Sequence, residues 1–222
     1  RVLKTSQILS TFRLNSQFGR YSTKTVEALR KREMFFPCCV EELKTREMNE
    51  GVTIDMSMQQ PLLSASAADL RTLLQRIEQD IVPKTRKGVK NGNKVFGAAI
   101  LDSELDLIIA ETNNEIVNPL FHGEINLINE WAKVTPAAER GPTAQKSVFL
   151  STHEPCCMCI SSIVWAGFTK VFYLFSYAIT TAQGIPHDIR TMHELWGVNS
   201  YRKTNRYIST ACIMDLIKEL PE

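Results

Sequence analysis

The clearest pattern in the first half of the chain is an apolar stripe at helical spacing. Between Ala67 and Val82, apolar side chains recur every three or four residues, at Leu70, Leu73, Leu74, Ile77 and Ile81. This spacing predicts an amphipathic helix that covers a sheet face, and Ser66 is a favoured residue to cap it. The next residues, Pro83–Lys94, are basic and contain two glycines, which predicts a loop. Its lysines and arginines are either solvated or in contact with phosphate or RNA.

Short apolar runs alternate with helical stretches through the middle of the chain. The predicted order is strand, strand, helix, strand, helix, strand, at Val95–Leu101, Leu105–Ala110, His122–Lys133, Lys146–Thr152, Cys156–Ala166 and Val171–Phe175. The first two strands form a hairpin, and the last run is apolar throughout, as in strands buried on both faces. Residues 134–146 are polar with Pro and Gly and predict a loop. With helices to cover both sides, this order predicts an α/β fold, a three-layer α/β/α sandwich around a mixed sheet.

These elements place the main domain at residues 66–222. Its last part carries a predicted helix from about Gly184 to Trp196, a basic and aromatic stretch at Tyr201–Tyr207, and an amphipathic helix at Ala211–Leu220. Together they form a C-terminal helical extension. Residues 25–65 are expected to be an accessory segment. The adjacent Cys38 and Cys39 in that segment suit packing better than a shared metal ion.

The first 24 residues differ from the rest of the chain in composition. They are rich in Ser and Thr, and residues 1–26 carry five basic groups and no acidic one. This composition, with apolar residues at roughly helical spacing, is typical of a mitochondrial transit peptide. The alternatives are therefore a presequence, which predicts a mitochondrial protein, or a basic N-terminal helix of a cytoplasmic one.

Composition and charge narrow the classes of function. Apolar residues make up 44% and charged residues 23% of the 222 residues, an ordinary globular profile, and no run of eighteen apolar residues predicts a membrane span. Beyond residue 26, 21 basic groups face 24 acidic ones. Nucleic-acid binding depends on clustered positive charge, so this balance favours a small substrate. Six cysteines in a chain of this length indicate reduced thiols rather than a disulfide framework.

Two short motifs carry the chemistry. Cys156 and Cys159 form a C-x-x-C pair directly after Pro155, which suits the first position of a helix. A helix N-terminus lowers thiol pKa values, so both sulfurs are available as thiolates. With a neutral imidazole from His122 they make three ligands for Zn²⁺ and leave a fourth position open to water, as in catalytic zinc sites. Glu124, two residues after His122, can move the proton of that water.

The combination His122-Gly-Glu124 with Pro155-Cys156-x-x-Cys159 resembles the signature of the zinc nucleobase deaminases. From about Ala68 to about Tyr177 the chain is similar to the cytidine deaminase-like superfamily, in the branch of cytosine, guanine and tRNA-adenosine deaminases. The resemblance implies a hydrolytic deaminase with His122, Cys156 and Cys159 as zinc ligands. It makes Glu124 the general acid and base, and it implies a homo-oligomer such as a dimer.

The resemblance also implies substrate contacts. Phe96-Gly97-Ala98 is similar to the segment that starts the sheet in this superfamily, where Gly and Ala let the substrate ring approach the backbone; tight helix–sheet packing is the other explanation for Gly97. Asn113 stands close to the position of an Asn that binds the base or ribose in relatives. Glu154 corresponds to a Glu near the substrate ring in guanine and tRNA-adenosine deaminases, whereas Gly123 is typical of free-cytosine deaminases.

These hints predict a free nucleobase or nucleoside as substrate, with purine ahead of pyrimidine. One alternative is a tRNA adenosine deaminase subunit, with Arg202, Lys203 and Arg206 available to touch RNA. Another is a zinc-binding partner subunit without catalytic activity.

Overall fold

The computed structural model describes residues 59–220. The predicted transit peptide at 1–24, Cys38–Cys39 and almost all of the accessory segment 25–65 lie outside the described residues. The described residues belong to one compact unit of the chain, Asp55–Glu222. No helix among them is both long enough and apolar enough to cross a membrane.

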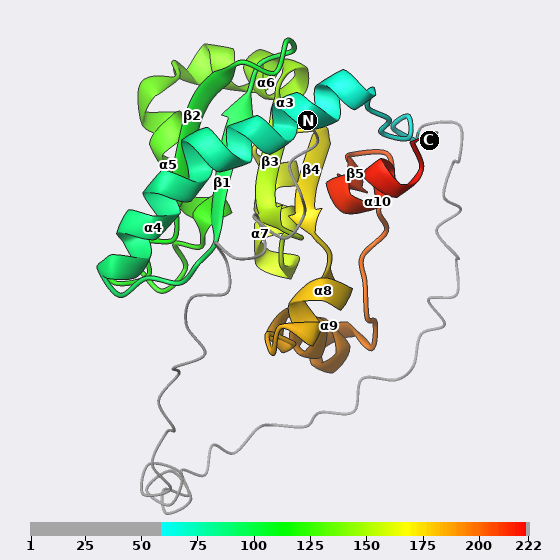
Figure 1. The fold of residues 1–222 in the computed structure, drawn as a ribbon. Coiled ribbons are helices and arrows are strands. Elements are labelled where there is room, and N and C mark those ends of the chain that lie inside the picture. Colours follow the sequence, from blue (N-terminus) through cyan, green and yellow to red (C-terminus); the bar gives the residue numbers. More distant parts are fainter. Residues whose placement is uncertain (1–58, 221–222) are drawn as a thin grey trace, which may run out of the picture. The chain divides into compact units, whose positions relative to one another are not determined.

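A mixed sheet forms the centre of this unit (Figure 1). Its five strands are β1 (Gly97–Leu101), β2 (Leu107–Thr112), β3 (Val148–His153), β4 (Lys170–Phe175) and β5 (Ser209–Cys212). They lie in the order β2-β1-β3-β4-β5. The three strands on the β2 side pair antiparallel, with Ala98 opposite Ser151, and the pairs β3–β4 and β4–β5 are parallel. Because β3 and β4 lie in the middle, nearly all of their side chains are buried.

Helices cover both faces of the sheet, which confirms the predicted three-layer α/β/α sandwich. On one face, α3 (Ala67–Arg76), the π-helical turn η2 (Ile77–Ile81) and α4 (Val82–Lys90) run as one long helix across β1 and β2 (Figure 1). The other face carries α5 (Gly123–Val134), α6 (Ala137–Lys146) and α7 (Cys157–Trp165). Leu127, Trp131, Phe149, Ile163 and Phe168 form the centre of the core beneath α5 and α7.

The predicted loop at Pro83–Lys94 is wrong for Pro83–Lys90, because α4 continues to Lys90, and only residues 91–94 form a turn and loop. Proline lacks the N–H that a helix needs and clashes with the preceding turn. Here the wide turn η2 ends at Ile81, two residues before Pro83, and the N–H of Val82 reaches back to the carbonyl of Ile77. That change of hydrogen bonding lets the helix pass the proline.

Residues 134–146 are likewise largely helical and not a loop. Helix α6 contains Gly141 and Pro142 but is tied to the end of α5, because Arg140 donates hydrogen bonds to the carbonyls of Ala132 and Thr135. Ala144 of α6 is fully buried. Tertiary contacts therefore override the two helix-breaking residues.

The C-terminal part also differs from the prediction. Ala211 and Cys212, which were expected to open the last helix, belong to β5, and the helix itself is only α10 (Ile213–Lys218). A strand of four residues is too short to show an alternating pattern. Between β4 and β5 lie α8 (Tyr177–Ala182), which was not predicted, and α9 (His187–Trp196), which confirms the predicted helix. Figure 1 shows both beyond the end of β4.

Candidate metal centre

The chemistry-bearing residues gather where β3 and β4 end and β1 begins. His153 pairs with Phe175 at the ends of β3 and β4, and its ring contacts the rings of Phe96 and Phe175 at 4.7 and 5.2 Å. Thr152 Oγ1 donates to the carbonyl of Gly97 at 3.1 Å, which ties the start of β1 to this end of the sheet. Helices α5 and α7 begin at the same end, so their N-termini and the loop ends of the strands converge.

Both predicted metal motifs lie at helix starts. His122 is the N-cap residue of α5 and Cys156 the N-cap residue of α7, with Cys159 in the first turn. The sequence predicted Pro155 as the first helical residue. In the structure it comes one residue before the N-cap and lies outside the helix. In the positions found, both cysteine sulfurs lie near the positive end of the α7 dipole, which favours thiolates.

The three ligand side chains come together as predicted, with all ligand atoms within 4.8 Å of one another. His122 Nδ1 lies 3.7 Å from Cys156 Sγ and 3.7 Å from Cys159 Sγ. Tetrahedral Zn²⁺ with ordinary Zn–N and Zn–S bonds holds such atoms about 3.6 Å apart. The described residues thus fit Zn²⁺, with two thiolates and one imidazole and no fourth protein ligand in this group.

A shared hydrogen bond shifts the pKa values of the two thiols in opposite directions. The hydrogen bond from Cys159, with help from His122, lowers the pKa of Cys156 to about 4. The same bond and burial raise the pKa of the Cys159 thiol well above its usual value. Metal binding requires deprotonated thiols, so a bound divalent cation would ionise the second thiol as well.

Glu124 is buried beside this group. Ser151 Oγ donates a hydrogen bond of 3.0 Å to Glu124 Oε1. Burial, and next the negative charge of Cys156, raise the pKa of Glu124 to about 7, although the Ser151 bond opposes the shift. A carboxyl with such a pKa can both take and give a proton near neutral pH.

The outer face of His122 meets a second carboxylate. His122 Nε2 lies 3.7 Å from Glu115 Oε1, and Lys94 Nζ donates to the same oxygen at 2.8 Å. A carboxylate behind a metal-binding histidine favours the tautomer that leaves the other nitrogen free for the metal.

Asn113, the predicted base contact, follows β2 in the chain, and its side chain reaches the first residue of α5. Its Oδ1 accepts the N–H of Gly123 at 2.6 Å, so it satisfies one of the unpaired donors of that helix. Its Nδ2 is buried and has no hydrogen-bond partner among the described residues. A buried amide N–H without a partner is costly, which makes this atom a candidate for contact with a bound molecule.

The predicted strand contacts are mostly enclosed. Ala98 is fully buried in the core, and only Phe96 keeps part of its surface exposed. A Cβ added at Gly97 would lie 2.6 Å from Ile81 Cγ2 and from Thr85 Oγ1. Tight helix–sheet packing is therefore sufficient to explain Gly97.

Gly123 has a packing reason of the same kind. A Cβ there would lie 2.9 Å from Gly97 Cα, so the two glycines let α5 rest against the start of β1. The structure thus gives Gly123 a reason unrelated to the choice of base.

Glu154 follows β3, and both of its carboxylate oxygens have partners within the protein. Oε2 accepts the N–H of Tyr177 at 2.9 Å, and Oε1 is paired with Lys203 Nζ. The side chain of Glu154 is only 3% exposed.

The sequence did not point to the roles of Ser151, Glu115 and Lys203. Ser151 belongs to a strand that is buried throughout and yet carries three polar residues, which is a usable signal. Glu115 and Lys203 lie in irregular segments, where no pattern indicates a partner.

A family model described as the cytidine and deoxycytidylate deaminase zinc-binding region matches residues 73–175. These residues belong to the cytidine deaminase-like superfamily. The match includes all three ligands of the metal group and Glu124. A comparison with curated proteins finds no match.

Several solved structures are similar to the superfamily region and to parts around it. The guanine deaminase from Bacillus subtilis is 25% identical over 60% of this chain and 83% of its own, with a TM-score of 0.44. A structure from work on tRNA:A34 deaminases is 20% identical over 46% of this chain and 72% of its own, with a TM-score of 0.38. The dCMP deaminase of cyanophage S-TIM5 is 18% identical over 55% of this chain and 95% of its own, with a TM-score of 0.36.

Proposed function

We propose that the protein hydrolyses an exocyclic amine on a free nucleobase or nucleoside, leaving a carbonyl and releasing ammonia. The observation that carries this proposal is the buried Glu124, held by Ser151 beside a metal group of two cysteines and one histidine. A structural zinc site needs no buried acid next to it, whereas a hydrolytic one does.

The residues divide the work in the following way. His122, Cys156 and Cys159 would hold Zn²⁺, which acts as a Lewis acid and makes water a nucleophile near neutral pH. Ser151 keeps Glu124 Oε1 in place, so the carboxylate can take a proton from the attacking water. Glu124 passes this proton to a ring nitrogen, then takes the second proton of the former water from the oxygen now bonded to the ring carbon and gives it to the departing amine. One carboxyl serves as base and acid in turn.

Two features of the described residues support substrate contacts. Asn113 Nδ2 offers a buried hydrogen-bond donor that suits a carbonyl or ring nitrogen of a base. The partly exposed ring of Phe96 lies edge-on to His153, and such a ring can pack against a flat heterocycle.

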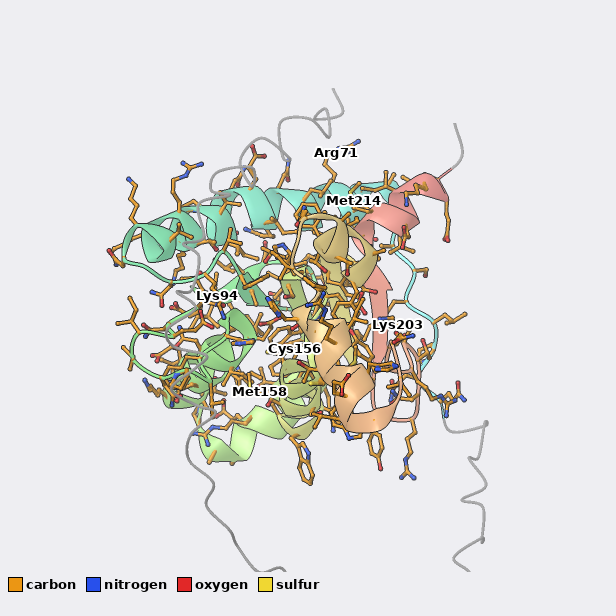
Figure 2. The ribbon with its side chains drawn as sticks, turned by 90° about the horizontal axis from the view of Figure 1, so that it is seen from below. Arg71, Lys94, Cys156, Met158, Lys203 and Met214 are labelled. Atoms are coloured by element: carbon orange, nitrogen blue, oxygen red, sulfur yellow. The ribbon has the colours of Figure 1, made fainter. Side chains whose placement is uncertain are left out.

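The charges near the metal group support a substrate without phosphate. Lys94 is paired with Glu115 and Lys203 with Glu154. Figure 2 shows these two lysines on either side of Cys156. Because each ammonium already has a carboxylate partner, neither offers the free positive charge that phosphate or RNA binding requires.

The choice of base is best made by assay, since Glu154 and Gly123 both have partners or packing reasons inside the protein. Zinc-loaded full-length protein would be tested for ammonia release from cytosine, cytidine, adenine, adenosine, guanine and guanosine, and from a tRNA anticodon stem-loop. We expect turnover of one free base or nucleoside. Glu124→Gln should retain zinc and lose at least about 100-fold in kcat.

The matched control is Glu130→Gln, on the same helix but in its second half, where Glu130 pairs with Lys133 and accepts a hydrogen bond from Asn129. It should leave kcat unchanged. Activity on the stem-loop alone, falling steeply with salt, would favour the tRNA-editing alternative. Silence on every substrate with one zinc per chain would favour the inactive partner subunit. Wild-type turnover by Glu124→Gln would exclude the proposed mechanism.

A further inference from the structure

The segment before β5 reaches the metal-ligand turn through one ion pair. Lys203 Nζ pairs with Glu154 Oε1, and Glu154 stands two residues before Cys156. We propose that Lys203 is a positioning residue for the metal. By neutralising the buried carboxylate of Glu154, it holds the turn Glu154–Cys156 in the conformation that presents the Cys156 sulfur.

Several bonds fix this turn from the β4–α8 side. The N–H of Glu154 donates to the carbonyl of Phe175 at 2.8 Å. Tyr177 forms hydrogen bonds with both residues that precede Cys156. Its N–H donates to Glu154 Oε2 at 2.9 Å, and its hydroxyl donates to the carbonyl of Pro155 at 2.6 Å. The carboxylate of Glu154 is therefore one of the points on which the position of Cys156 depends.

Lys203 is itself well held. Its ammonium lies 4.0 Å from the ring centre of Tyr201, and 5.4 and 5.6 Å from those of Tyr177 and Tyr173. Aromatic faces attract a cation, most strongly where water is excluded. The carbonyl of Lys203 accepts the N–H of Thr210, the second residue of β5, at 2.8 Å. These contacts fix the ammonium opposite Glu154.

Because Glu154 is buried, the loss of its ion pair with Lys203 is expected to disturb the turn. The side chain of Glu154 is 3% exposed, and removal of one partner of a buried pair leaves an uncompensated charge. Without Lys203, the carboxylate is expected to turn toward water, and the Tyr177 N–H bond would be lost with it. The turn would then present Cys156 less well. Metal sites are sensitive to such outer contacts, whose removal typically lowers metal affinity about 10–100-fold.

The inference concerns metal affinity and holds whatever the substrate is. In this proposal Glu154 holds the turn Glu154–Cys156 in place, instead of contacting the substrate as the resemblance implies. A merely structural lysine would stabilise the fold with and without zinc alike, whereas a positioning lysine changes the affinity for zinc and the geometry of its ligands.

The test compares three variants of the full chain. Lys203→Met removes the charge and keeps most of the apolar stem, and Lys203→Arg keeps the charge. Lys218→Met is the matched control, since Lys218 pairs with Asp215 in an exposed pair. Zinc affinity would be measured by competition with a chromophoric chelator, and ligand geometry by the thiolate-to-metal absorption of the Co²⁺-loaded protein.

We expect Lys203→Met to bind zinc about 10–100-fold more weakly and to shift the Co²⁺ bands. Lys203→Arg should recover most of the affinity, and Lys218→Met should match wild type. Wild-type affinity and bands in Lys203→Met would overturn the proposal.

A second comparison removes the carboxylate charge. In a Glu154→Gln background no buried charge needs Lys203, so adding Lys203→Met should cost little further affinity. An equal loss in both backgrounds would refute the charge-pair explanation. If Lys203→Met alone does not fold, the double variant should restore folding, and its failure to do so would refute the explanation too.

Discussion

A methyl group at Gly123 tests how closely the zinc helix must approach the sheet. The added Cβ would lie 2.9 Å from Gly97 Cα and 3.1 Å from both Gly97 N and Phe96 O. All three are backbone atoms, which cannot rotate away as a side chain does. Gly97 cannot retreat either, because Ile81 and Thr85 enclose it from the other side of the sheet.

The magnitude follows from two opposing effects. Forcing a methyl group into a closely packed site costs about 1–3 kcal/mol. Alanine is a better helix residue than glycine by about 0.5–1 kcal/mol, and this gain is smaller at the first position of α5. We therefore expect Gly123→Ala to lower the free energy of unfolding by about 1–2 kcal/mol. His122 and Glu124 move with the helix, so zinc affinity should fall about tenfold, or about 1.4 kcal/mol.

Gly141→Ala is the matched control. Gly141 lies inside α6, and a Cβ there would meet no atom within 4 Å outside its own helical turn and chain neighbours. Pro142 follows directly and disfavours the helical conformation for a preceding residue with a Cβ, which offsets the helix gain, so this substitution should change the free energy of unfolding by less than about 1 kcal/mol. Both variants would be unfolded in urea, with zinc and with chelator. If Gly123→Ala were as stable as Gly141→Ala and kept wild-type zinc affinity, the contact between Gly97 and Gly123 would not determine the position of α5.

Two further substitutions test neighbouring groups. Ser151→Ala removes the hydrogen bond to Glu124, so kcat should fall about tenfold while zinc content stays unchanged, measured by ammonia release and metal analysis. Burial lowers the pKa of His153 to about 3 against about 6.5 when unfolded, so its stabilising effect is complete above pH 6.5 and is lost as the pH falls toward 3. From pH 7 to pH 5 the wild type should therefore lose about 2 kcal/mol of its free energy of unfolding through His153. His153→Phe, unfolded in chelator over the same pH range, should lose about 2 kcal/mol less. Equal losses in both proteins would contradict the lowered pKa of His153.

The parts of the fold that the sequence predicted are those with strong local patterns. The stripe of leucines in α3, the apolar run of β4 and the C-x-x-C pair each depend on a few neighbouring residues, and each was found where expected. The failures came where distant contacts decide. Pro83 and Pro142 predicted loops, but a π-helical turn and the bonds of Arg140 keep both segments helical. Strand β5 owes its conformation to pairing with β4, which no local pattern reveals.

The candidate site divides in the same manner. The ligand group and Glu124 were predictable because zinc chemistry restricts the residue types and their spacing. What positions them was not, because Ser151 and Lys203 act across 27 and 49 residues of chain. A hydrogen bond or ion pair of that span depends on the packing of whole elements.

That division also explains why the hints about the base weakened once the structure was known. Glu154 suggested a purine and Gly123 a pyrimidine, each by likeness to a different branch. In the structure Glu154 binds Lys203 and Tyr177, and Gly123 packs against Gly97. Residues with such internal roles are constrained by the fold, so their identity carries little information about the ligand. The side chains that retain unused capacity are the better guides. Asn113, with its buried Nδ2 lacking a partner among the described residues, is the first of these to vary in a search for the substrate.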